Sequence, residues 1–147
     1  MTNWQQIVSM KYDKCFGCGQ ANPAGLRLNF KWDGRTARAE FTPTELYQGW
    51  QDIVHGGIIA VMLDEAAGWA MQFEGLNPIT TKMEIRFIHP AIIGKPLIIT
   101  GSITKRNGKR VEAKASIISE EDTLIAECRA TYLGIKADEE TNVNQQG

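Results

Sequence analysis

Alternation of apolar and polar residues dominates the chain, and a period of two is typical of β-strands with one buried face. Alternating or β-branched apolar residues mark six segments, 26–32, 37–41, 82–87, 97–105, 111–117 and 124–132. The dipeptides Asp33-Gly34 and Asn107-Gly108 are typical of tight hairpins. We therefore expect six strands, with hairpins at these two places.

A single segment, 56–73, departs from this pattern because its apolar residues cover nearly the whole circumference of a helix. A helix that is apolar all round is typically buried. At ~1.5 Å per residue this helix would be ~27 Å long. Asp64 and Glu65 are the only acidic residues in its middle.

The predicted order is β-β-α-β-β-β-β, an α+β fold in which an antiparallel six-stranded sheet curls around one long buried helix. The prediction is a single domain over 1–147 with its core at about 15–133. Residues 1–14 form an N-terminal extension with one short amphipathic turn or helix, and 135–147 form a polar tail that we expect to be disordered. Exposed sheet edges would favour dimerisation.

Composition narrows the class of protein further. The 147 residues are 43% hydrophobic and 22% charged, and 16 Lys+Arg against 17 Asp+Glu give a net charge of −1. This apolar fraction is too high for a disordered chain, and nucleic-acid binders usually carry a basic excess. Neither a secretory signal nor a ~20-residue apolar span is visible. We expect a cytoplasmic protein that binds neither nucleic acid nor membrane.

The three cysteines do not form a disulfide framework, because their number is odd. Cys15 and Cys18 have zinc-ligand spacing, but structural zinc normally takes four ligands. Cys128 stands alone in a predicted strand, and the only histidines are His55 and His89. The favoured interpretation is a turn with buried thiols and no metal; a metal shared between subunits and a redox pair are the alternatives.

Candidate chemistry gathers at the start and in the middle of the helix. His55, Gly56 and Gly57 stand at its N-terminus, where exposed N–H groups and the helix dipole favour an anion or a developing oxyanion. Asp64 follows nine residues after His55. A carboxylate within a buried helix is costly unless it is paired or performs chemistry, such as general-base catalysis.

Each of these residues also has a structural interpretation. The two glycines could form only a turn, and His55 could serve only as a hydrogen-bonding group at the helix start. At least one of Asp64 and Glu65 could emerge at the surface and pair with Lys or Arg. His89 precedes a proline, so a role at a strand end is favoured for it over catalysis.

The sequence resembles a known family at these residues. HGG at 55–57, then Asp64, then EAAGWA looks like the hotdog-fold thioesterases of the PaaI-like, acyl-CoA type. The predicted element order matches that fold, and 80–97 resembles the family's first long strand after the helix. The opening CFGCGQANPAGLRLNF, 15–30, resembles a signature of some members. The resemblance extends over about 15–133 and leaves the substrate open.

The resemblance implies hydrolysis of an acyl-CoA to a free acid and CoA without a cofactor. Asp64 would be the catalytic carboxylate, acting either as general base on water or as nucleophile. The N–H of Gly56, with that of Gly57, would polarise the thioester oxygen, and His55 would support the helix start. Glu65 ranks second as the carboxylate.

The sequence departs from the family pattern at Gly49, where several relatives carry Asn or Gln six positions before the HGG histidine. Gln48 or Gln51 could supply the amide instead. Thr80 or Thr81 could contribute from the following strand. These four residues are candidates for substrate binding.

Coenzyme A requires basic contacts for its phosphates. Four cations surround one predicted hairpin turn, namely Lys105, Arg106, Lys109 and Arg110. A merely solvated hairpin tip is the favoured interpretation of this cluster, and Arg86 and Lys82 are alternative phosphate ligands.

Helix geometry argues for a shared site. Gly57 and Asp64 are separated by ~10 Å of helical rise, whereas hydrogen bonds require ~3 Å. Both groups can act on one thioester only if they come from two copies of the helix. We therefore expect a homodimer or homotetramer.

Two rival functions remain. Acyl-thioester dehydratases and hydratases of this fold place Asp five residues before His, whereas Asp52 lies three before His55. A non-catalytic acyl-CoA-binding module would lack the carboxylate in the helix, and Asp64 is present.

Overall fold

The computed structural model describes residues 3–9 and 13–137. Its elements follow one another as α1 (Trp4–Val8), β1 (Lys31–Trp32), β2 (Ala37–Phe41), the 3-10 helix η1 (Glu45–Tyr47), α2 (Gly56–Gln72), β3 (Asn77–Phe87), β4 (Leu97–Asn107), β5 (Arg110–Ser119) and β6 (Leu124–Ile135). This order confirms the predicted β-β-α-β-β-β-β arrangement and the short N-terminal helix.

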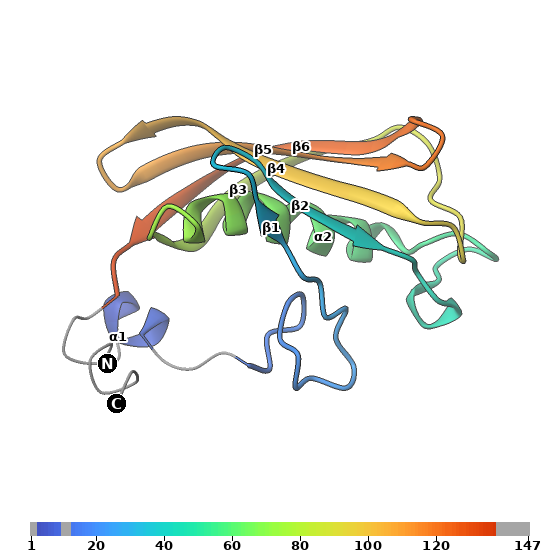
Figure 1. Ribbon diagram of the computed structural model, residues 1–147, viewed down its shortest axis with the longest axis horizontal. Coiled ribbons are helices and arrows are strands. Elements are labelled where there is room, and N and C mark those ends of the chain that lie inside the picture. The colour runs from blue at the N-terminus through green and yellow to red at the C-terminus, as the bar shows by residue number, and fades with distance from the viewer. Residues whose placement is uncertain (1–2, 10–12, 138–147) are drawn as a thin grey trace.

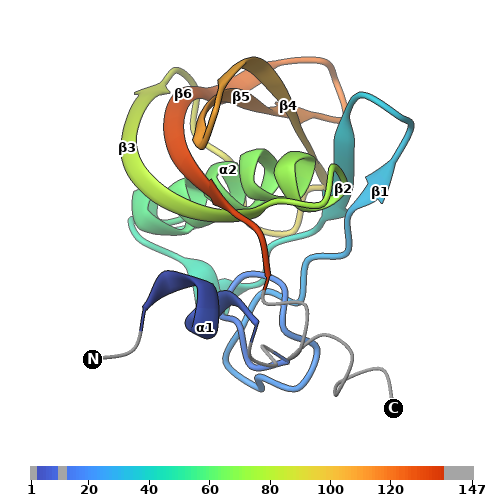
Figure 2. The ribbon, with the colours of Figure 1, turned by 90° about the vertical axis from the view of Figure 1, so that its left-hand side faces the viewer.

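The strands form one antiparallel sheet in the order β1-β2-β4-β5-β6-β3. Figure 2 shows this sheet curling around α2, while α1 and the loop that follows it lie beneath. The predicted α+β hotdog architecture is therefore confirmed. Among the described residues no helix is long and apolar enough to cross a membrane.

Helix α2 lies against the concave face of the sheet along its length (Figure 1). Met62 and Leu63 are fully buried at its centre, as is Ile99 on β4. At Gly101, β4 approaches so closely that an added Cβ would overlap the carbonyl of Ala66. The absence of a side chain at this position allows sheet and helix to pack directly together.

The predicted strand over 26–32 is wrong in part, because only Lys31–Trp32 join the sheet. Upstream, the N–H of Leu26 donates to the carbonyl of Phe16 at 2.9 Å, and that of Leu28 donates to Gly17 at 2.9 Å. The side chains of Leu26 and Leu28 are still buried. The alternation therefore predicts correctly which side chains are buried. The backbone, however, pairs with the loop that contains Cys15 and Cys18, which we call the cysteine loop.

The two predicted hairpins form, with one difference in the turns. Asp33 begins a four-residue connection in which its carboxylate accepts from the N–H groups of Arg35 and Thr36, at 2.9 and 2.7 Å. The β4–β5 turn is tight and contains Gly108 with φ of 63°. At the C-terminus, β6 includes Ile135, which the predicted tail contained; 138–147 lie outside the described residues.

Candidate active site

The start of α2 is fixed by His55, its N-cap residue. The Nδ1 atom of His55 accepts a hydrogen bond from the N–H of Gly57 at 2.8 Å. In the neutral imidazole the proton is therefore on Nε2. The N–H of Gly56 has no acceptor among the described residues, and Gly56 is exposed in the single chain. Of the two predicted oxyanion donors, Gly56 is thus the one that is available.

The loop before the helix holds both candidate glutamines around Asp52. The Gln48 Oε1 atom accepts from the N–H of Asp52 at 3.0 Å, and the Gln51 amide donates to the Asp52 carboxylate at 3.0 Å. Gln48 also lines a cleft of about 480 Å³ together with Gly49, His55 and Gly56. The structure therefore places Gln48, and not Gln51, beside the helix start.

Asp64 is held by two hydroxyl groups in the middle of α2. Its Oδ1 atom accepts from Thr80 Oγ1 at 2.9 Å and from the Tyr132 hydroxyl at 2.8 Å. Oδ2 has no donor within the part of the chain that the structure describes. Burial, reinforced by the charge of Asp64, raises the pKa of Tyr132, so Tyr132 remains a protonated donor.

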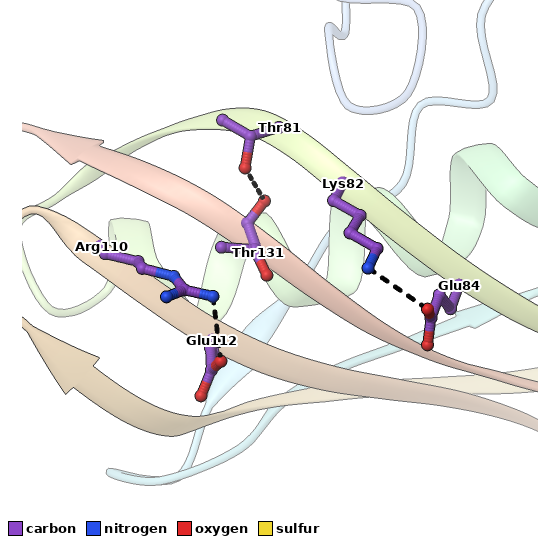
Figure 3. A network of polar contacts seen from close by, with 6 residues as sticks. All are labelled: Thr81, Lys82, Glu84, Arg110, Glu112 and Thr131. Atoms are coloured by element: carbon purple, nitrogen blue, oxygen red, sulfur yellow. Dashed lines mark hydrogen bonds and ion pairs between the residues drawn. The ribbon is translucent and has the colours of Figure 1, made fainter.

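The pairing of β3 with β6 explains why these two hydroxyl groups converge. Thr80 and Tyr132 are direct partners across the two strands, and the register shifts between Thr80 and Lys82. Such a bulge re-aims the neighbouring side chains. Thr81, the next residue on β3, has a different partner: its hydroxyl donates to the carbonyl of Thr131 on β6 at 2.8 Å (Figure 3). Thr80, and not Thr81, therefore contacts the candidate carboxylate.

A cavity of about 470 Å³ opens at Asp64. Thr80 and Tyr132 line it from the sheet, Gly68 lines it from the helix, and Ile7 lines it from α1. The cysteine loop forms another part of its wall. The predicted catalytic carboxylate thus borders a space that combines apolar and hydrogen-bonding groups, as small-molecule sites usually do.

Glu65, the second-ranked carboxylate, points to a different partner. The Cys15 thiol donates to its Oε1 atom at 3.4 Å. Burial raises the pKa of Glu65, although hydrogen bonds from Cys18 and Cys15 oppose the shift. The ligand atoms of Cys15, Cys18 and Glu65 all lie within 4.8 Å of one another, and they could hold a metal ion. Cysteine and histidine spacing does not indicate Glu65 as a ligand, because Glu65 lies fifty residues after Cys15 in the sequence.

The predicted phosphate ligands do not gather at the helix start. Arg86 pairs with Glu127 at 3.2 Å, and Arg110 pairs with Glu112 at 3.5 Å (Figure 3). Lys105 and Arg106 are exposed and have no carboxylate partner among the described residues.

The β4–β5 turn lies toward the end of α2. There the carbonyl of Lys109 accepts from the N–H of Gly134, which adjoins Met71. The β4–β5 turn therefore lies at the opposite end of α2 from the start of that helix (Figure 1). Within one chain, this cluster is not close to the candidate oxyanion donor.

Strand β3 links the two halves of the candidate site. Thr80 near its start contacts Asp64, and the ring of Phe87 at its end lies beside Gly56. β3 is the last strand of the sheet, with a partner, β6, on one side only among the described residues. The start of α2 therefore lies beside one end of β3, and Asp64 lies beside the other end. The outer edge of β3 has no strand partner among the described residues.

A sheet wrapped around one helix, with a capped glycine start and a central carboxylate, defines a hotdog-fold protein. The model of the thioesterase superfamily matches residues 51–134, and the chain belongs to this superfamily. The matched region contains α2, β3, β4, β5 and all of β6 except its last residue.

Known proteins resemble the chain over part of its length. Acyl-coenzyme A thioesterase THEM4 of Xenopus laevis is 28% identical over 96 residues, covering 65% of this chain and 43% of that protein. The chain spans less than half the length of the curated relatives it matches.

Solved structures show the same fold. The PaaI protein of Escherichia coli, from the phenylacetic acid degradation operon, has a TM-score of 0.71 at 20% identity and covers 76% of this chain and 82% of that one. A hypothetical thioesterase of Streptococcus pneumoniae, solved with coenzyme A, has a TM-score of 0.71 at 14% identity, with coverages of 76% and 91%.

Proposed function

We propose that this protein hydrolyses an acyl-CoA thioester to a free acid and CoA, with Asp64 as the catalytic carboxylate. The observation that carries this proposal is the fixed orientation of Asp64 in its cavity. Thr80 and Tyr132 both bond Oδ1, which leaves Oδ2 for a water molecule or for the thioester carbon. A pre-oriented carboxylate is what either general-base or nucleophilic catalysis requires.

In the general-base form, Asp64 removes a proton from water as the water oxygen bonds to the acyl carbon. The resulting oxyanion expels the CoA thiolate by breaking the C–S bond, and the proton passes from Asp64 to the thiolate. In the nucleophilic form, the Asp64 carboxylate bonds to the acyl carbon and the C–S bond breaks, which releases the CoA thiolate and leaves an acyl–Asp64 anhydride. Water then hydrolyses this anhydride to the free acid, regenerates the Asp64 carboxylate and supplies the proton that the thiolate takes up. Both forms need a donor for the oxyanion, and the N–H of Gly56 is the candidate.

The donor and the carboxylate would come from two subunits. Antiparallel pairing of two β3 edges about a two-fold axis brings the Phe87 end of one strand beside the Thr80 end of the other. Because Phe87 adjoins Gly56 and Thr80 bonds Asp64, this pairing brings each helix start toward the carboxylate of the other copy. A homodimer with two shared sites is the simplest assembly that fits.

Two comparisons support an acyl-CoA substrate, since one relative is an acyl-coenzyme A thioesterase and one protein of the same fold was solved with coenzyme A. Lys105 and Arg106 are the proposed phosphate contacts, because they lack the carboxylate partners that Arg86 and Arg110 have. In the proposed dimer, Lys105 and Arg106 would contact the phosphates of a CoA bound in either of the two shared sites.

The test is thiol release from a panel of short, long and aromatic acyl-CoAs. Wild type is compared with Asp64→Asn, and Glu74→Gln in the exposed turn after α2 is the matched control for loss of one carboxylate charge. We expect a drop in kcat of at least about 100-fold for Asp64→Asn alone. Release unchanged by Asp64→Asn would refute the mechanism, binding without release would indicate a binding module, and consumption of an enoyl-CoA without thiol release would indicate a hydratase.

A further inference from the structure

Two thiols and one carboxylate converge beside the proposed catalytic cavity. Cys15 and Cys18 come from the N-terminal loop, and Glu65 comes from α2 fifty residues after Cys15. Their ligand atoms all lie within 4.8 Å of one another, while the Cys15 thiol and Glu65 Oε1 are 3.4 Å apart. Tetrahedral zinc places its ligands ~2.0–2.3 Å from the metal, so small side-chain movements suffice to surround an ion.

The loop is built to hold the two cysteines at this place. The N–H of Gly19 donates to the carbonyl of Cys15 at 2.9 Å, which closes the turn. Leu26 and Leu28 bind the loop backbone at Phe16 and Gly17 and anchor it to the core.

Glycine at two positions allows the close approach within this loop. A Cβ at Gly17 would overlap the side chain of Glu65, and a Cβ at Gly19 would overlap the backbone of Cys15 and of Asp13. The turn therefore packs directly against Glu65. The loop and helix alone hold the three ligand atoms close together, and no bound ion is needed to do so.

The cluster brings groups that can carry negative charge close together, and no basic side chain of the described residues pairs with its carboxylate. Glu65 forms no ion pair with a Lys or Arg in the described part of the chain. Asp64, a second carboxylate, lies next to Glu65 in the sequence. A divalent cation would replace the missing Lys or Arg partner of Glu65 and would offset the charge of the two thiolates that form when it binds.

We propose that Cys15, Cys18 and Glu65 bind one thiolate-preferring divalent cation, with Zn²⁺ as the expected ion. Binding releases the two thiol protons to solvent and leaves a fourth coordination position toward the cavity, where a water ligand would complete a tetrahedron. The ion would tie the N-terminal loop to α2 and thereby fix one wall of the cavity. This proposal does not depend on the thioesterase reaction, since all three ligands are defined by the loop and helix.

The test measures metal binding by the full chain after reduction and removal of bound metal. When the metal-free chain is incubated with Zn²⁺ and desalted, we expect about one Zn²⁺ per chain to be retained. When it is incubated with Co²⁺ instead, we expect a thiolate-to-cobalt charge-transfer band. Cys15→Ser, Cys18→Ser and Glu65→Gln should each weaken binding at least about tenfold. Cys128→Ser is the matched control, because Cys128 is buried in β6 and is not one of the residues whose ligand atoms converge, so its replacement should leave binding unchanged.

Two results would overturn the proposal. One is a wild-type chain that retains no stoichiometric Zn²⁺ and shows no charge-transfer band with Co²⁺. The other is equal loss of binding in Cys128→Ser and in the two loop variants. The Co²⁺ spectrum is taken on wild type, so the proposal stays testable even if a loop variant does not fold.

Discussion

The hydroxyl of Tyr132 donates to the Oδ1 atom of Asp64 at 2.8 Å, although the two residues are 68 positions apart in the chain. Tyr132 is only 1% exposed, so the donor of this bond is shielded from water, while the half-buried Asp64 also borders the cavity. Hydrogen bonds to a charged group in such surroundings are stronger than neutral ones. Tyr132 therefore acts on the candidate carboxylate as a positioning residue, together with Thr80.

Replacing Tyr132 with Phe should weaken catalysis without unfolding the protein. The variant keeps the buried ring but loses one of the two donors that orient Asp64, so we expect kcat to fall about 10- to 100-fold and KM to change little. Stability should fall by about 1 kcal/mol. Steady-state thiol release and urea unfolding measure the two effects.

The matched control is Tyr47→Phe, which removes another tyrosine hydroxyl that bonds a backbone carbonyl, that of Gly25, at 2.9 Å. Its kcat should remain close to wild type. Thr80→Val should resemble Tyr132→Phe, because it removes the other donor to the same oxygen. Full activity in both Asp64-contact variants would contradict the positioning role.

Replacing Gly56 with Pro should remove the proposed oxyanion donor while preserving α2. Proline is accepted at the first position of a helix, and His55 already has the extended backbone, with ψ of 136°, that precedes proline. We expect kcat/KM to fall about 100- to 1,000-fold. Gly56→Ala keeps the N–H, and its Cβ makes only ordinary contact with Phe87. Comparable losses in both variants would show that the N–H is not the donor.

The fold was largely predictable from the sequence because its signals are local. The apolar circumference of 56–73 and the hairpin dipeptides each determine one element without reference to distant residues. The segment 26–30 was not predictable in this way, since burial fixes its alternation while its backbone partners lie in the loop at Phe16 and Gly17. The hydrophobic pattern indicates which side chains of a segment are buried, but it does not indicate which strand or loop the backbone of that segment bonds to.

The candidate site was most fully predictable where its residues share one helix, whereas Thr80 was predicted only as an alternative to Thr81 and Tyr132 was not predicted. His55, Gly56 and Asp64 lie at the start and in the middle of one helix, so their relative positions could be predicted from helix geometry. Tyr132 and Thr80 reach Asp64 through the register of β3 and β6, and that register includes a bulge that no local pattern marks. The approach of Cys15 to Glu65 likewise depends on the path of a loop across the helix.

Adding one methyl group at Gly101 should destabilise the whole fold. In Gly101→Ala the Cβ would overlap the backbone of Ala66 and Ala67, so β4 and α2 must separate. We expect a loss of about 1–3 kcal/mol in the free energy of unfolding. Ser102→Ala, one residue along the same strand, is the control and should change stability by less than about 0.5 kcal/mol. Denaturant midpoints of the two variants decide the question.

Neutralising Arg106 should weaken binding of the coenzyme and not of the acyl group. For Arg106→Gln we expect KM for an acyl-CoA to rise about 3- to 10-fold, since one charge-assisted phosphate contact is lost. KM for the matching N-acetylcysteamine thioester, which has no phosphates, should not change. Arg38→Gln is the control, because Arg38 is paired with Glu40 on β2. Equal effects on both substrates would exclude a phosphate contact.

Mixing two inactive variants should restore activity if each site is shared between subunits. In a dimer of Asp64→Asn with Gly56→Pro, one of the two sites combines an intact carboxylate with an intact helix start. Random exchange makes about half of the dimers mixed, so the mixture should regain about a quarter of wild-type activity. Each variant alone supplies the baseline, and light scattering verifies that the chains are at least dimeric. Activity that stays at the baseline after complete exchange would place the whole site within one chain, and it would remove the reason for pairing β3 with a second copy.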